Sequence, residues 1–161
     1  MAHARPAEQA VTMQIRPATV ADLPALTALY AHLIPEEAPC DLTIAKASLT
    51  QLMTWAGSAI LVADDGARLL ASCTLVVIPN LTRGGKPYGL IENVVTHADA
   101  RRTGLGRRIL HAAAEQAWAA GCYKVMLLTG ADRPDNHAFY TASGFEQSKT
   151  GFQMRRHPKR A

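Results

Sequence analysis

A basic loop with two glycines, Arg101-Arg102-Thr103-Gly104-Leu105-Gly106, has the residue types and spacing to bind an anion. It follows an apolar, strand-like run at Leu90–Thr96 and precedes a stretch with the apolar periodicity of a helix. The first backbone N–H groups of a helix have no intrahelical partner and carry partial positive charge. Gly104 and Gly106 have no side chains, so an anion can approach these groups closely. Strand, loop and helix together predict a phosphate-binding cradle.

Two well-known phosphate loops do not match this stretch. A dinucleotide-binding fingerprint requires a third glycine, and Ile109 stands at that position. A Walker loop requires Gly-Lys-Ser/Thr, and neither Gly104 nor Gly106 is followed by lysine. Taken alone, the loop also fits a surface turn that caps a helix.

The elements that would position this loop follow from hydrophobic periodicity and turn residues. In the first half of the chain, we expect a strand at Met13–Ile15, a helix capped by Thr19 with apolar positions to Leu33, and a helix from Asp41 or Thr43 through Trp55. Two strands follow at Ser58–Ala63 and Leu69–Ile78, joined by the turn Asp64-Asp65-Gly66. The second half is expected to contain a strand at Tyr88–Thr96, a helix to about Ala120, a strand at Tyr123–Leu128, a helix at Asn136–Ser143 and a last strand at Gly151–Arg155. This order predicts an α/β fold with a mixed central sheet and helices on both faces.

Composition places the chain among ordinary soluble globular proteins. The 161 residues are 48% hydrophobic and 19% charged, which fits one compact domain. We expect residues 1–12 to be a flexible lead-in and residues 13–157 to be that domain. The formal charge of +4 suits an anionic ligand without identifying it.

Several classes of function are disfavoured by the same sequence. The basic tail is interpreted as a solubility feature, because no helix-turn-helix, zinc-finger or RNP-like pattern accompanies it, so no nucleic-acid partner is expected. No stretch has the length of a signal peptide core or a membrane span. Three widely spaced cysteines form no Cys-x-x-Cys pair, and the expected location is the cytoplasm. His97, His111 and His137 lack metal-ligand spacing, so no metal is expected.

A second signature lies downstream at Asn136–Phe145, where a helical tyrosine is followed by Gly-Phe. Together with Arg-x-x-Gly-x-Gly, it resembles the GNAT family of N-acetyltransferases over nearly the whole chain from Ile15. The nearest branch is that of the glucosamine-6-phosphate N-acetyltransferases, through Ile91–Val95, Gly121–Val125 and Asn136 before Phe139-Tyr140. The resemblance implies a GNAT fold, in which splayed strands hold acetyl-CoA, and transfer of an acetyl group to an amine.

The sequence departs from that branch at the substrate side. The branch has an acidic residue directly after the glutamate of its cofactor strand, and Asn93 stands there in this chain. Its next strand ends in acidic residues, whereas this chain has Leu127-Leu128-Thr129-Gly130. An amide cannot take up a proton as a carboxylate does. The acceptor is therefore expected to be an amine of unknown identity.

The reaction requires loss of a proton from the amine, a donor for the oxyanion and a proton for the departing thiolate. The resemblance implies that Tyr140 is the acid that donates a proton to the departing thiolate. The alternative is that Tyr140 is a packing residue of the core. Glu92, inside an apolar strand, needs a partner. It can accept the amine's proton through water, orient the amine or pair with an arginine. Asn93 can bind substrate or satisfy backbone groups at the strand's end.

The resemblance also assigns the cofactor contacts. The backbone of Val94, Val95 and Thr96 would contact the pantetheine arm, and Asn136 would bind its amides beside Tyr140. The main chain from Arg102 to Arg107 would surround the pyrophosphate, with Arg101 fixing the loop or supplying charge. The cofactor-binding residues of the cradle are thus Arg101, Arg102, Thr103, Gly104, Leu105, Gly106 and Arg107.

A small-molecule amine is the expected partner. The alternatives are a protein acetyltransferase acting on lysine or an N-terminus, and a non-catalytic acyl-CoA sensor. The connection Pro35–Pro39 is either a wall of the acceptor site or a plain loop between helices. Phe152 and Met154 alternate with polar residues in the expected last strand, an edge that could pair with a second copy. Because the sugar acetyltransferases that the chain resembles form dimers through this region, the resemblance implies a homodimer.

Overall fold

The computed structural model describes residues 12–157, so the expected lead-in lies outside the described residues except for Thr12. Five strands of the described chain form one sheet in the order β1-β2-β3-β4-β5. The first four strands are antiparallel to their neighbours and β5 is parallel to β4, which confirms the predicted mixed sheet. The strands are β1 (Gln14–Pro17), β2 (Ala59–Asp64), β3 (Leu69–Ile78), β4 (Tyr88–Thr96) and β5 (Val125–Leu127).

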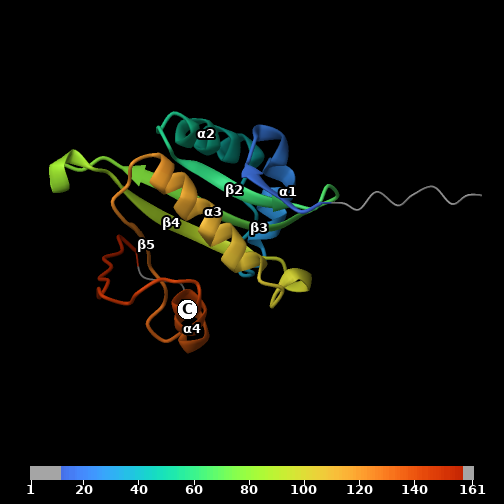
Figure 1. Ribbon diagram of the computed structural model, residues 1–161. Helices are drawn as coiled ribbons and strands as arrows, with labels where there is room; N and C mark the ends of the chain where they lie inside the picture. The colour runs from blue at the N-terminus through green and yellow to red at the C-terminus, as the bar shows by residue number, and fades with distance from the viewer. Residues whose placement is uncertain (1–11, 158–161) are drawn as a thin grey trace, which may run out of the picture.

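Helices cover both faces of this sheet (Figure 1). One core cluster lies between the sheet and α3, and a second lies between the sheet, α1 and α2. The fourth helix, α4, follows β5 and lies beyond that end of the sheet (Figure 1). The helices are α1 (Leu23–Tyr30), α2 (Leu42–Met53), α3 (Leu105–Ala119) and α4 (Pro134–Ala142), with 3₁₀ turns η1 (Val20–Asp22), η2 (Arg83–Gly85) and η3 (Ala98–Ala100).

The helix starts follow the capping residues that the sequence offers. Asp41 accepts hydrogen bonds from the backbone N–H groups of Thr43 and Ile44, which begins α2. The first helical segment begins after Thr19, as expected, but it ends at Tyr30 and not at Leu33. Leu33 lies in the turn that follows and is exposed. Pro35 disfavours helical geometry at the residue before it, so the chain leaves the helix early.

The apolar stripe of α3 is confirmed. Leu105, Ile109, Ala113 and Ala117 are buried, and Leu110 widens the stripe. The alanines let the helix approach the sheet closely. A Cβ added at Gly89 of β4 would lie 3.3 Å from the Cβ of Ala117. The last turn of α3 therefore packs closely against the first residues of β4.

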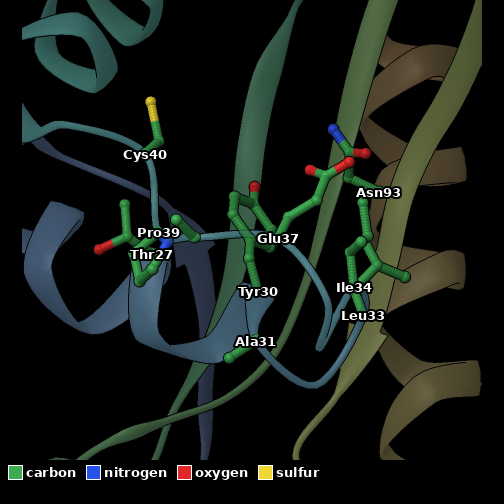
Figure 2. Close-up of a pocket in the computed structure, with 10 residues that line it drawn as sticks. Thr27, Tyr30, Ala31, Leu33, Ile34, Glu37, Pro39, Cys40 and Asn93 are labelled. Carbon is green, nitrogen blue, oxygen red and sulfur yellow. The ribbon is translucent and has the colours of Figure 1, made fainter. Parts of the chain in front are cut away.

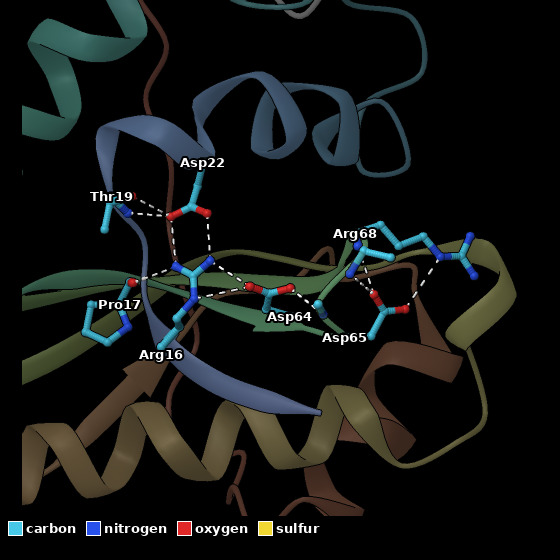
Figure 3. Close-up of polar contacts among 9 residues, drawn as sticks. Arg16, Pro17, Thr19, Asp22, Asp64, Asp65 and Arg68 are labelled. Carbon is cyan, nitrogen blue, oxygen red and sulfur yellow. Dashed lines mark hydrogen bonds and ion pairs between the residues drawn. The ribbon is translucent and has the colours of Figure 1, made fainter. Parts of the chain in front are cut away.

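An ion cluster joins the first strand to its neighbours (Figure 3). The Arg16 guanidinium lies 2.7 Å from a carboxylate oxygen of Asp22 in η1 and 2.7 Å from one of Asp64 in β2. Asp22 also accepts a hydrogen bond from the backbone N–H of Thr19. The hydrogen bonds from Arg16 hold the pKa of the Asp22 carboxyl far below its usual range. The cluster thus fixes β1 to the sheet.

The expected last strand is wrong. Residues 151–155 form no strand, and the side chains of Phe152 and Met154 are 93% and 98% exposed. The chain passes β5, because a Cβ added at Gly151 would lie 2.8 Å from a methyl group of Leu128. An alternating pattern forms a strand only where it pairs with the edge of another strand, and residues 151–155 pair with no described strand.

Candidate functional site

The sheet opens between β4 and β5. The two strands pair only where Gly89–Ile91 lies beside Val125–Leu127, and β4 then continues alone to Thr96. From Glu92 onward, the β5-facing edge of β4 pairs with no strand of the described chain. Its backbone groups are therefore available to an extended ligand. This is the splay that the resemblance implied.

A β-bulge lies at the same place. Ser72 pairs with Val95 and Thr74 with Glu92, so three steps along β4 match two steps along β3. Asn93 has a φ of +52° there, a conformation that asparagine tolerates better than most residues. The bulge breaks the alternation of side chains, because Ile91 and Val94 both pack in the core under α3. The one sequence feature that pointed to this bulge was an asparagine inside an apolar strand.

The cradle has the open helix start that the sequence predicts. Gly104 precedes α3 with a φ of +82°, and α3 has no side-chain cap. A Cβ added at Gly104 would meet no atom within 4 Å. The space beside Gly104 is therefore open, and no side chain caps the first N–H groups of α3. Arg102 also has a positive φ, of +61°.

The second glycine, Gly106, also serves the packing of the helices. A Cβ added at Gly106 would lie 3.1 Å from Cζ of Phe139 and 3.2 Å from Oγ1 of Thr96. Gly106 thus permits close contact of α4, α3 and β4, and this contact brings the residues of α4 to the splay.

Arginine side chains of the cradle divide into two groups. Arg101 donates hydrogen bonds to the backbone carbonyls of Thr96 and His32, so it fixes the loop to β4 and to the turn after α1. Arg102 and Arg107 are exposed and form no ion pair within the described part of the chain. Their charge is available to an anion at the start of α3.

Tyr140 lies on α4 against the core under α3. Its ring contacts those of Phe139 and Phe145, at centroid distances of 5.1 and 6.2 Å. Its hydroxyl makes no hydrogen bond to any residue that the structure describes. Burial raises the pKa of the Tyr140 phenol, and electrostatic interactions with Cys73 and Glu92 raise it further. The alternative expectation was a core tyrosine with a hydrogen-bonded hydroxyl. The hydroxyl of Tyr140 has no such partner among the described residues.

Glu92 is half-buried on β4 opposite Thr74. Its carboxylate forms no ion pair or hydrogen bond with another described residue, so the expected option of an arginine partner is wrong. Asn136 lies in the first turn of α4 and donates a hydrogen bond to Oγ1 of Thr129. Asn136 therefore faces the chain segment that follows β5.

The three histidines considered as metal ligands have local partners. A ring nitrogen of His97 accepts a hydrogen bond from the backbone of Asp99. Ring nitrogens of His111 and His137 lie 3.0 Å from the carbonyl oxygens of Ser143 and Gly130. Within residues 12–157, no group of three or more His, Cys, Asp or Glu side chains is arranged to hold a metal ion.

Two adjoining pockets open on the face covered by α1 and α2. The first, here called the loop pocket, has a volume of about 350 Å³ and lies between α1, the loop after it and β4. Figure 2 shows Tyr30, Glu37 and Asn93 reaching into it. The second, here called the helix pocket, has a volume of about 330 Å³ and lies between α1, α2 and the sheet. Both pockets are lined by Tyr30, Cys40 and Asn93, together with Thr27.

Two residues of this region were not predicted from the sequence. Tyr30 was assigned only to a helix stripe, yet it lines both pockets, and burial raises its pKa. Glu37 belongs to the connection Pro35–Pro39, for which a pocket wall was one of two interpretations. Its position in the loop pocket favours that interpretation. The acidic composition of this connection was the sequence feature that indicated a pocket wall.

Comparison with known proteins gives a consistent result. The family model "Acetyltransferase (GNAT) family" matches residues 26–145. A protein of Oryza sativa subsp. japonica named probable glucosamine 6-phosphate N-acetyltransferase 2 is 42% identical over 59% of this chain and 57% of its own length. The glucosamine 6-phosphate N-acetyltransferase of Trypanosoma brucei brucei is 31% identical over 73% of this chain and 80% of its own. The chain thus spans little more than half of the rice protein.

Among solved structures, a proposed acetyltransferase of Agrobacterium tumefaciens str. C58 is similar with a TM-score of 0.83 and 44% identity. The match covers 89% of this chain and 99% of that one. No helix of residues 12–157 has the length and apolar character needed to cross a membrane.

Proposed function

Because the chain belongs to the acetyltransferase (GNAT) family, we propose that it transfers the acetyl group of acetyl-CoA to the amine of a small molecule. The observation that carries the proposal is the position of the splay. It lies between the open start of α3 and the two pockets, with Glu92 and Asn93 on β4 at the junction.

The residues present fit acetyl-CoA. The unpaired edge of β4 from Val94 to Thr96 offers backbone groups to the pantetheine amides. The uncapped N–H groups at the start of α3 fit the pyrophosphate, and the unpaired charges of Arg102 and Arg107 strengthen the field there. Asn136 on α4 supplies a side-chain amide on the other side of the splay.

Acetyl-CoA supplies an activated acyl group as its thioester. Glu92 accepts a proton from the ammonium form of the substrate through a water molecule, which leaves a neutral amine to attack the carbonyl carbon. A carbon–nitrogen bond forms and the carbon–sulfur bond breaks. Tyr140 donates its phenolic proton to the departing sulfur, and its phenolate takes up the second proton of the attacking nitrogen, which leaves a neutral amide, a free thiol and a protonated Tyr140. A tyrosine kept protonated by burial suits this role.

The volumes of the pockets favour a small acceptor. Each lies near the lower end of the range of about 300–1,000 Å³ that is typical of small-molecule sites. A protein substrate would instead need a long groove for its backbone. This distinguishes the proposal from the alternative of a protein acetyltransferase.

The test is acetyl-CoA turnover, followed as release of free thiol against a panel of small amines and lysine peptides. We expect thiol release with at least one small amine and none above background with peptides. Calorimetry should show acetyl-CoA binding without added metal. Binding without thiol release for any amine would identify a sensor and contradict the proposal. A response to peptides alone would make the chain a protein acetyltransferase.

A further inference from the structure

The two pockets differ in their chemistry. The helix pocket is walled mainly by apolar side chains from α1, α2, the turn after α2 and β2, namely Leu23, Leu26, Leu49, Leu52, Trp55 and Ile60. Its remaining described lining residues are uncharged polar groups or small side chains. A phosphate in this pocket would lose its water without gaining a cationic partner, which is strongly unfavourable.

The loop pocket carries the opposite charge to the one a phosphate requires. Glu37 is its charged group, and no lysine or arginine is among the described residues that line it. A carboxylate here attracts an ammonium group and repels an anion. Asn93 lines both pockets from the bulge of β4, next to Glu92. The junction of the two pockets is therefore the place where an amine nitrogen reaches the splay.

We propose that the acceptor is a cationic primary amine with an uncharged, apolar substituent such as an aryl or branched alkyl group. This inference rests on the proposed acetyl transfer and names its substrate class. The substituent occupies the helix pocket, Glu37 attracts the ammonium group, and the nitrogen lies at Asn93. A phosphorylated amino sugar, which the names of the relatives would suggest, fits neither pocket.

The substrate test compares three amines at equal acetyl-CoA: phenethylamine, ethylamine and glucosamine 6-phosphate. We expect phenethylamine to be used with a kcat/KM about 10- to 100-fold higher than ethylamine, the effect of burying one aromatic side chain. Glucosamine 6-phosphate should be the poorest of the three. A higher kcat/KM for glucosamine 6-phosphate than for phenethylamine would overturn the inference and leave acetyl transfer itself intact.

Variants with matched controls test each pocket. Glu37→Gln keeps the shape of the loop pocket and should raise the KM for phenethylamine about tenfold, as expected for one charged contact, with kcat little changed. Its control is Glu36→Gln, because Glu36 is not among the residues that line either pocket. Equal KM values for the two variants would remove Glu37 from substrate recognition.

For the helix pocket, Trp55→Ala should lower kcat/KM about tenfold for phenethylamine and leave ethylamine unchanged. The control is Trp118→Ala on α3, because the exposures of the two tryptophans are 47% and 45% and Trp118 lines neither pocket. An equal loss for both amines would contradict the assignment.

A last measurement separates the two proposals. Calorimetry in which phenethylamine is titrated into protein saturated with CoA measures binding of the amine to the pockets. No acetyl group is present, so no reaction occurs. Binding that weakens in Glu37→Gln supports the acceptor class even where no thiol is released. Absence of binding, together with thiol release for another amine, overturns the acceptor class alone.

Discussion

At the scale of single residues, Tyr140 is the side chain whose role is most directly testable. Tyr140→Phe keeps the ring contacts with Phe139 and Phe145 and removes only the hydroxyl. Turnover should fall by about 10²–10⁴-fold, the usual range for loss of a positioned acid. The KM for acetyl-CoA should change little, because the anion contacts lie at α3. Tyr123→Phe, at an exposed tyrosine, is the control. Near-normal turnover would make Tyr140 a packing residue.

Glu92 can be tested in the same way. Glu92→Gln removes the proton acceptor, so kcat should fall and the acidic limb of the pH–rate profile should disappear. Glu115→Gln on the exposed side of α3 should leave the profile unchanged. Retention of the acidic limb in Glu92→Gln would show that another group accepts the proton.

The residues of the splay could be predicted because they belong to contiguous motifs. Glu92, Asn93 and Tyr140 sit at fixed places within such stretches, and the roles expected of them stay predictions. Tyr30 and Glu37 could not be found in this way. They come from a helix end and a loop that carry no motif, and only the packing of α1 against β4 places them beside Asn93.

At the scale of elements, the start of α3 is the feature to test. Gly104→Val places a β-branched residue at a φ of +82° and should abolish acetyl-CoA binding, because the loop must move. The matched control is Gly121→Val at the other end of α3. Gly121 has a φ of +79°, and its Cβ position is equally open. Both variants should lose about 1–2 kcal/mol of stability.

Calorimetry and thermal unfolding separate the two effects. Only Gly104→Val should lose affinity for acetyl-CoA, whereas both should unfold at a lower temperature. Unchanged affinity in Gly104→Val would contradict the cradle. Equal loss of affinity in both variants would show that strain anywhere in α3 is sufficient, and the specific role of its first turn would fall.

The elements themselves were largely predictable, with two instructive exceptions. Hydrophobic periodicity gave the helices and strands because each buries one face or stripe against the sheet. The bulge at Asn93 could not be derived, since it depends on the register with β3. The last strand was expected from an alternating pattern alone, and such a pattern says nothing about whether an edge is available to pair with it.

At the scale of the whole molecule, the Arg16 cluster links stability to pH. The pKa of Asp22 is lowered in the folded state, so its contribution is fully present above its unfolded value of about 3.9 and is lost as the pH falls below that value. Asp22→Asn should cost about 1–2 kcal/mol at pH 7, since the group is partly exposed. Urea unfolding should give a constant difference from about pH 6 to 8 that shrinks below about pH 4. A difference that persists at low pH would contradict the ion-pair origin.

The remaining question at the scale of the whole molecule is whether two copies of the chain form a dimer. Among the described strands, β5 pairs with β4 on one side only, and the side chains of Phe152 and Met154 are almost fully exposed. Such a segment, alternating and unpaired, can add to the edge of another molecule and bury both apolar side chains.

We therefore predict a homodimer at micromolar protein, with the dimer mass measured by light scattering. Phe152→Ser combined with Met154→Ser should give the monomer mass. Leu81→Ser, at a fully exposed leucine in a different loop, should leave the dimer intact. A monomer mass for the unmodified chain would overturn the prediction.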